Sequence, residues 1–231
     1  MIPVKICGIT SLKSAQVAIH AGASAIGFIF FPQSPRYVIP DIAASISRQL
    51  PNHIARVGIF VNEKIDTIHS TVKTVGLDFL QLYPHQEKLD ELSRKYSVIS
   101  AIQVKNDEVP SLPDGNISAY LLDTYRDGKF GGTGESFDLK AVQNLATEVP
   151  IILSGGLNPD NILKAIQTVK PQAVDVNSGV ETSPGVKDYQ KIMHLFEILQ
   201  STGNYPNLFE RNLTRIIRHQ GTKTLKDIEN K

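Results

Sequence analysis

Short apolar runs alternate with longer amphipathic segments along most of the chain. A short run rich in Val, Ile, Leu and Phe is typical of a buried strand, whereas apolar residues every three or four positions are typical of a surface helix. The pattern predicts eight strands, which begin about every 20–30 residues, the length of one strand–helix unit. They span residues 4–7, 25–30, 56–61, 79–82, 98–103, 120–123, 151–154 and 173–176.

The segments between the strands carry helix signals. Ser11 is a favourable N-cap for a helix that runs to residue 21, where Gly22 ends it. Asn158 followed by Pro159 predicts another helix start, because proline suits the first helical turn. The segment 106–116 contains two prolines and a glycine, so a helix there should be short or absent. The remaining helices are predicted at 40–50, 64–75, 85–95, 139–147, 159–169 and 188–200.

Regular alternation of strands and helices favours a parallel sheet covered by helices. Eight units in about 200 residues predict the α/β class and a single, small (β/α)8 TIM barrel. An open, doubly wound sheet is the alternative, but no Gly-x-Gly-x-x-Gly motif follows the first strand. We expect residues 1–200 to form the barrel domain and 201–231 a short C-terminal extension, helical at 208–219 or loosely ordered. The extension is either a frayed end or a partner-binding arm.

Composition limits the possible partners. The 231 residues are 41% hydrophobic with a net charge of +1, so the charge balance does not point to nucleic acid. The sequence has no run of 18 apolar residues and no basic-then-apolar leader, so we expect neither a membrane partner nor secretion. A single cysteine excludes an internal disulfide, and the six histidines lack the close pairing of metal ligands. We expect a cytoplasmic monomer or homodimer without a metal.

Cys7 ends the first predicted strand and is the single cysteine of the chain. Alternate residues of a strand share a face, so Lys5 and Cys7 should point inward together while Val4 and Ile6 pack against helices. An ammonium group beside a thiol favours the thiolate, which is the reactive form. The alternative is that Cys7 is simply a small buried hydrophobe.

Further polar residues stand at the carboxyl ends of the predicted strands, where the active sites of barrels lie. Asp123 closes the apolar sixth strand, and a carboxylate there is costly unless it is hydrogen-bonded or functional. Arg36 lies in a proline-rich loop after the second strand and can clamp a carboxylate through two hydrogen bonds. Gln81 should face inward on the fourth strand. Asp175 should face inward on the eighth, where it either forms a structural ion pair with Lys5 or also holds polar groups beneath a ligand.

Glycine pairs follow the seventh and eighth predicted strands. Gly155 and Gly156 come after one strand, and Ser178 and Gly179 after the other. Glycine lets backbone N–H groups approach an anion closely, and these two loops are the usual phosphate site of the fold. They predict a phosphate site made of main chain, without a lysine. The loop 125–137 contains four glycines and can fold over a ligand to expel water.

Seven motifs, in chain order at the expected strand ends, resemble the phosphoribosylanthranilate isomerase family. The resemblance runs from residue 2 to about residue 200. The motifs are Lys5-Ile6-Cys7-Gly8-Ile9-Thr10, Gly27-Phe28-Ile29-Phe30 with Ser34-Pro35-Arg36-Tyr37, Val57-Gly58-Ile59-Phe60-Val61-Asn62, Leu121-Leu122-Asp123-Thr124, Gly131-Gly132-Thr133-Gly134, Ser154-Gly155-Gly156-Leu157-Asn158-Pro159, and Val174-Asp175-Val176-Asn177-Ser178-Gly179-Val180-Glu181 with Ser183-Pro184-Gly185.

The resemblance implies a step of tryptophan biosynthesis, an Amadori rearrangement of N-(5-phosphoribosyl)anthranilate that needs no cofactor or metal. The product is 1-(2-carboxyphenylamino)-1-deoxyribulose 5-phosphate. By resemblance, Cys7 is the general base and Asp123 the general acid. Arg36 takes the anthranilate carboxylate, and the two glycine loops take the phosphate.

Two features depart from the family pattern. The family usually has a histidine and a glycine after the fourth strand, where this chain has Tyr83-Pro84, so substrate packing or rate should differ. The extension after residue 200 is the other departure. Among rival enzymes, the related isomerase of histidine synthesis uses an aspartate where Cys7 stands, and a metal-dependent epimerase needs metal ligands that are missing here. A non-catalytic phosphometabolite-binding barrel could lose Cys7 or Asp123, and both are present.

Overall fold

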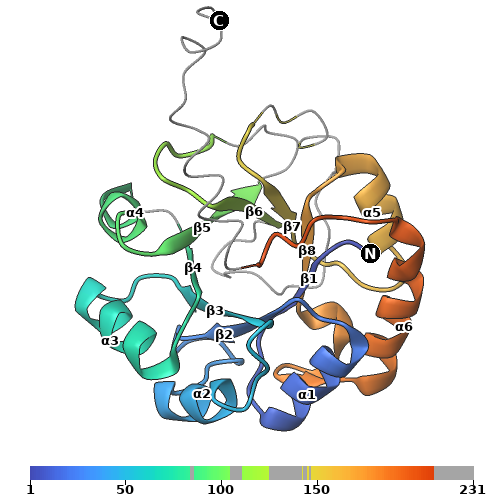
Figure 1. The fold of residues 1–231 in the computed structure, drawn as a ribbon, viewed down its shortest axis with the longest axis horizontal. Helices are drawn as coiled ribbons and strands as arrows, with labels where there is room; N and C mark the ends of the chain where they lie inside the picture. The colour runs from blue at the N-terminus through green and yellow to red at the C-terminus, as the bar shows by residue number, and fades with distance from the viewer. Residues whose placement is uncertain (84–85, 105–110, 125–141, 143–144, 146, 211–231) are drawn as a thin grey trace, which may run out of the picture.

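The computed structural model describes residues 1–83, 86–104, 111–124, 142, 145 and 147–210. Within them, eight parallel strands close into a barrel in the order β1 to β8, with helices around the outside (Figure 1). The predicted TIM barrel is therefore confirmed, and the open sheet is excluded. The strands are β1 (Val4–Ile6), β2 (Ala25–Ile29), β3 (Ala55–Phe60), β4 (Phe79–Leu82), β5 (Ser97–Val104), β6 (Ala119–Thr124), β7 (Ile151–Leu153) and β8 (Ala173–Val176).

The helices follow the strands much as the sequence predicts. Ser11 caps α1 by accepting a hydrogen bond from the backbone N–H of Ser14, and Gly22 ends this helix in a left-handed conformation. No helix in the described ranges is long and apolar enough to cross a membrane. The helices are α1 (Leu12–Ala21), α2 (Pro40–Ser47), α3 (Ile65–Val75), α4 (Gln86–Ser93), α5 (Ile162–Val169) and α6 (Tyr189–Leu199), with the 3-10 turns η2 (Ser178–Val180) and η3 (Gln200–Thr202) and the hairpin β9 (Glu181–Ser183) and β10 (Val186–Lys187).

The start of α5 differs from the prediction. Asn158 Oδ1 accepts hydrogen bonds from the backbone N–H groups of Asp160 and Asn161, at 2.9 and 3.2 Å. These bonds close a turn before the helix, so α5 begins at Ile162 and not at Pro159. Residues 111–116 are not helical, in line with Pro113 and Gly115. The predicted loop 125–137 and most of the predicted helix 139–147 lie outside the described residues.

Strand alternation divides the side chains between two apolar regions. Val4 and Ile6 belong to the layer between the strands and the helices, whereas Cys7 belongs to the barrel interior. Strands β1 and β8 close the barrel, with Lys5 opposite Asp175 in the register. The interior near the amino ends of the strands is lined largely by small side chains: Ala25, Ala55, Ala119 and Ala173.

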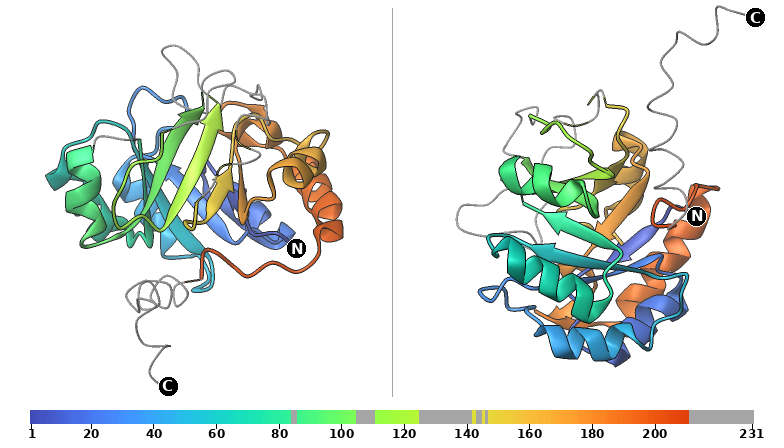
Figure 2. Two further views of the ribbon diagram at one scale, coloured as in Figure 1. Left: turned by 90° about the horizontal axis from the view of Figure 1, so that it is seen from above. Right: turned by 60° about the vertical axis from the view of Figure 1, so that its left-hand side comes forward.

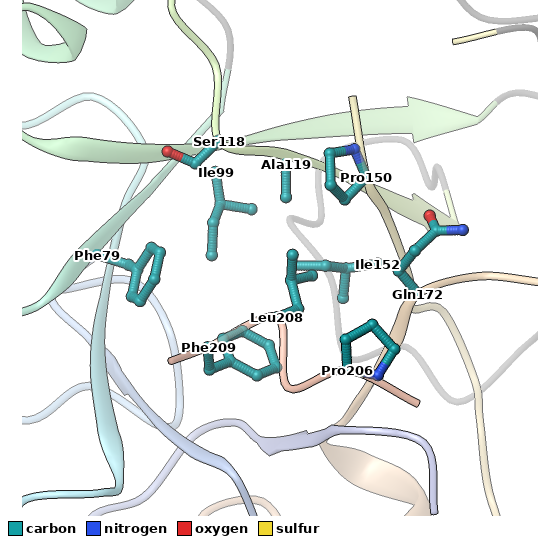
Figure 3. A pocket seen from close by; sticks show the side chains of 10 residues that line it. All are labelled: Phe79, Ile99, Ser118, Ala119, Pro150, Ile152, Gln172, Pro206, Leu208 and Phe209. Atoms are coloured by element: carbon teal, nitrogen blue, oxygen red, sulfur yellow. The ribbon is translucent and has the colours of Figure 1, made fainter. Parts of the chain in front are cut away.

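The end of the chain contributes to the barrel interior. After η3 the segment crosses beneath the amino ends of the strands (Figure 2, left). Phe209 is only 2% exposed, and its ring meets the ring of Phe79 edge-on with centroids 6.1 Å apart. A cavity of about 130 Å³ remains between this segment and the barrel (Figure 3). The predicted helix at 208–219 begins instead with a turn at Leu208 and Phe209, and its later part lies outside the described residues.

Candidate active site

A pocket at the carboxyl ends of the strands collects side chains from β1–β4 and β6–β8 or from the residues that follow them. Five residues singled out from the sequence lie together here: Cys7, Arg36, Gln81, Asp123 and Asp175. Gln81 is buried, and no described residue hydrogen-bonds its Oε1 atom. The other side chains that line the pocket are Ile29, Phe31, Ser34, Ile59, Val61, Tyr83, Ser154 and Asn177.

A buried ion pair forms the floor of the pocket. Lys5 Nζ lies 2.6 Å from Asp175 Oδ1, and Lys5 is completely buried. Ser154 Oγ donates a 3.3 Å hydrogen bond to the other carboxylate oxygen of Asp175. Burial alone would lower the pKa of Lys5, but the negative charges of Asp175 and Cys7 outweigh it, and the pKa is raised. Lys5 therefore remains an ammonium ion beside Cys7.

Cys7 follows β1 and is buried within the pocket wall. Gly27 on the neighbouring strand makes room for it, since a Cβ atom at Gly27 would lie 3.0 Å from Cys7 Sγ. Burial raises the pKa of the Cys7 thiol, and the ammonium groups of Lys5 and Lys187 offset only part of this effect. Lys5 thus favours the thiolate, as the sequence predicts, but the pKa of Cys7 is raised overall. Desolvation and the adjacent Asp175 charge are together stronger than the effect of Lys5.

Arg36 is held by a carboxylate that the sequence analysis did not single out. Its Nε and Nη2 atoms donate to the two oxygens of Glu181 at 3.0 and 2.8 Å, and this pair is buried. Lys187 Nζ reaches the same carboxylate at 2.8 Å and Asn177 Oδ1 at 2.9 Å. Burial would raise the pKa of Glu181, but Arg36 and Lys187 lower it overall. Two cations around one anion leave net positive charge beside the pocket, which suits an anionic ligand.

Glu181 and Lys187 were missed because their importance depends on the short hairpin β9–β10. The hairpin brings Lys187 back to Glu181, although the two are six residues apart. The available signal was the charged Glu181 just after the glycine loop that follows the eighth strand. Strand periodicity alone does not show that the chain reverses there.

Tyr83 and Asp123, which both line the pocket, are joined by a hydrogen bond. The Tyr83 hydroxyl group donates a hydrogen bond of 3.2 Å to Asp123 Oδ2, and Asp123 is 4% exposed. Burial, together with the negative charges of Asp123 and Cys7, raises the pKa of Tyr83 well above its usual value. The phenol thus stays protonated and remains a hydrogen-bond donor.

The two glycine loops lie against each other. Gly155 and Gly156 adopt left-handed conformations, with φ of +88° and +65°. Gly179 packs on the carbonyl group of Leu157 so closely that a Cβ atom would collide with it. The two loops therefore pack together as one unit.

This unit borders a second hollow next to the pocket. Gly156, Ser178 and Gly179 line the hollow together with Lys191. Ser154 and Asn177, which directly precede the two loops, line the main pocket itself. The Gly131-Gly132-Thr133-Gly134 motif lies outside the described residues. Within the described ranges, no group of three or more His, Cys, Asp and Glu residues is placed to hold a metal ion.

Comparison with known proteins gives one consistent result. The sequence model of the N-(5'phosphoribosyl)anthranilate (PRA) isomerase family matches residues 4–198. The N-(5'-phosphoribosyl)anthranilate isomerase of Geobacter sp. (strain M21) is 46% identical over 193 residues, which cover 83% of this chain and 95% of the relative.

Solved structures agree with the sequence match. The phosphoribosyl anthranilate isomerase of Thermotoga maritima superimposes with a TM-score of 0.78 at 37% identity, over 87% of this chain and 99% of that chain. A second isomerase structure holds reduced 1-(o-carboxyphenylamino)-1-deoxyribulose 5-phosphate; its TM-score is 0.73 at 35% identity, with 87% and 99% of the two chains covered.

Proposed function

This chain belongs to the N-(5'-phosphoribosyl)anthranilate isomerase family, and we infer that it rearranges N-(5-phosphoribosyl)anthranilate to 1-(2-carboxyphenylamino)-1-deoxyribulose 5-phosphate in tryptophan biosynthesis. The observation that carries this conclusion is that Cys7 and Asp123 line one pocket from β1 and β6, with Arg36 at the same pocket. The reaction is an internal redox exchange between two sugar carbons, so it needs no external oxidant. A reducing compartment such as the cytoplasm suits its free thiol.

Asp123 is the proposed general acid. Opening the furanose ring breaks the bond between C1 and the ring oxygen, and the electron pair goes to that oxygen. The oxygen then needs a proton, which a carboxylic acid in an enclosed site can supply. The burial of Asp123 at the end of an apolar strand supports this role.

Cys7 is the proposed general base. Ring opening leaves a Schiff base, which acidifies the proton on C2, and a thiolate can remove that proton to give an enolamine. Tautomerisation of the enolamine gives the ketone product. The raised pKa of Cys7 means that only a small fraction is thiolate at neutral pH, but that fraction is a stronger base than an ordinary thiolate.

The remaining residues bind substrate in this proposal. Arg36 uses Nε and Nη2 for Glu181, and no described residue accepts from its Nη1 atom, which would take the anthranilate carboxylate. The Oε1 atom of Gln81 can accept from a sugar hydroxyl group. Asp175 holds Lys5 and Ser154 beneath the sugar. The backbone at Gly155, Gly156, Ser178 and Gly179 receives the phosphate.

The test follows anthranilate-type fluorescence as the protein meets freshly made phosphoribosylanthranilate without added metal. We expect turnover by the wild type and a loss of kcat of orders of magnitude in Cys7→Ser and in Asp123→Asn. The Michaelis constants should change little, because the carboxylate and phosphate sites stay intact. Lys13→Ala, on the outer surface of α1, is the control and should match the wild type. Full activity in either active-site variant would refute the role of that residue.

A further inference from the structure

The hydrogen bond between Tyr83 and Asp123 has no part in the chemistry described above. Tyr83 directly follows β4, two residues after Gln81, and both side chains line the pocket. The Tyr83 hydroxyl group lies 3.2 Å from Oδ2 of Asp123, which is on β6. The sequence departs from the family pattern at this position.

We propose that Tyr83 is a positioning residue for Asp123, which fixes the carboxyl group and stabilises the charge left on it after proton transfer. The proposal rests on the proposed function, since it assumes that Asp123 is the acid. When Asp123 gives its proton to the ring oxygen, a negative charge appears on the carboxylate. The phenol O–H already points at Oδ2, so no reorganisation is needed to stabilise that charge.

The same hydrogen bond should influence when Asp123 is protonated. A donor to the charged form of a carboxyl group lowers its pKa. The phenol itself does not compete by ionising, because burial holds its own pKa well above the usual value. Among the described residues, the other titratable or charged side chains of the pocket and its floor are Lys5, Cys7, Arg36, Asp175, Glu181 and Lys187. All of these are unchanged when only the Tyr83 hydroxyl group is removed.

The decisive variant is therefore Tyr83→Phe, which keeps the ring and removes the donor. We expect kcat to fall about tenfold or more, the usual size for a hydrogen bond to a charged group. The Michaelis constant should change less than threefold, because substrate binding does not use this bond. The limb of the pH profile of kcat/KM that reports Asp123 should move to higher pH, since Asp123 then keeps its proton longer. Tyr83→His, which restores a donor, should recover part of kcat.

Tyr96→Phe is the matched control. The hydroxyl group of Tyr96 is hydrogen-bonded at 2.7 Å to Nδ1 of His69, which lies on α3 outside the barrel. The kcat and pH profile of Tyr96→Phe should therefore match the wild type. An unchanged kcat in Tyr83→Phe, or a lower kcat with both limbs of the pH profile unmoved, would overturn the proposal. Failure of the proposed function looks different, because the wild type would then not turn over phosphoribosylanthranilate, whereas a fully active Asp123→Asn would refute the acid role of Asp123. An inactive Asp123→Asn variant together with a fully active Tyr83→Phe variant would refute only the role of Tyr83.

Discussion

Replacing Phe209 by alanine should destabilise the barrel, because its ring packs at the amino ends of the strands, opposite the active site. The ring is 2% exposed and packs edge-on against Phe79. A buried Phe→Ala change costs about 3–5 kcal/mol, and the ring already borders a cavity of about 130 Å³ near a chain end that can relax. We therefore expect a loss of about 3 kcal/mol in the free energy of unfolding. For a chain of this size, such a loss corresponds to a decrease in Tm of about 6–12 °C.

Urea and thermal unfolding, followed by circular dichroism, measure this loss, and kcat/KM at 25 °C should stay near the wild-type value. Phe209→Leu keeps most of the apolar volume and should lose less than about 1.5 kcal/mol. Tyr189→Ala is the surface control, because Tyr189 is 53% exposed. If Phe209→Ala unfolds at the same temperature and urea concentration as the wild type, the segment does not support the barrel and the reasoning fails.

Three further outcomes follow from the site. Arg36→Met should raise the Michaelis constant about tenfold or more with a smaller effect on kcat, because a charge-assisted contact to the anthranilate carboxylate is lost. An unchanged Michaelis constant in steady-state assays would contradict this. Glu181→Gln should also raise the Michaelis constant, because it releases Arg36 from its carboxylate partner. Substrate titration of both single variants and the double mutant should show that their effects on the Michaelis constant are not additive. Because burial raises the pKa of Cys7, its thiolate fraction, followed by ultraviolet absorbance, should still be rising with pH at the usual thiol pKa of about 8.5. Lys5→Met should move this titration to still higher pH, and a titration that is complete well below pH 8.5 would contradict the reasoning.

The barrel could be predicted because each strand carries its own local signal. Apolar runs, helix caps such as Ser11 and stops such as Gly22 act over a few residues and do not depend on distant parts of the chain. The same periodicity correctly placed Cys7 and Lys5 on the inner face, and the order of strands around a barrel brought Asp175 next to Lys5.

The charge state of the site could not be predicted in the same way. The sequence shows that Lys5 stands beside Cys7, but the balance between desolvation and the Asp175 charge depends on the depth of burial. The bond between Tyr83 and Asp123 joins β4 and β6, which are not adjacent strands. The buried position of Phe209 depends on a long return of the chain beneath the barrel, and no local pattern reports it.

The ion pair between Lys5 and Asp175 links the first and last strands across 170 residues of sequence. At a synthesis rate of about 5–20 residues per second, Lys5 emerges roughly 10–30 s before its partner. During translation the ammonium group must therefore stay hydrated, because burial without Asp175 would leave an unpaired charge. A ribosome-bound chain that stops before β8 should lack a closed barrel, so its floor would be open to water and Cys7 exposed to thiol reagents.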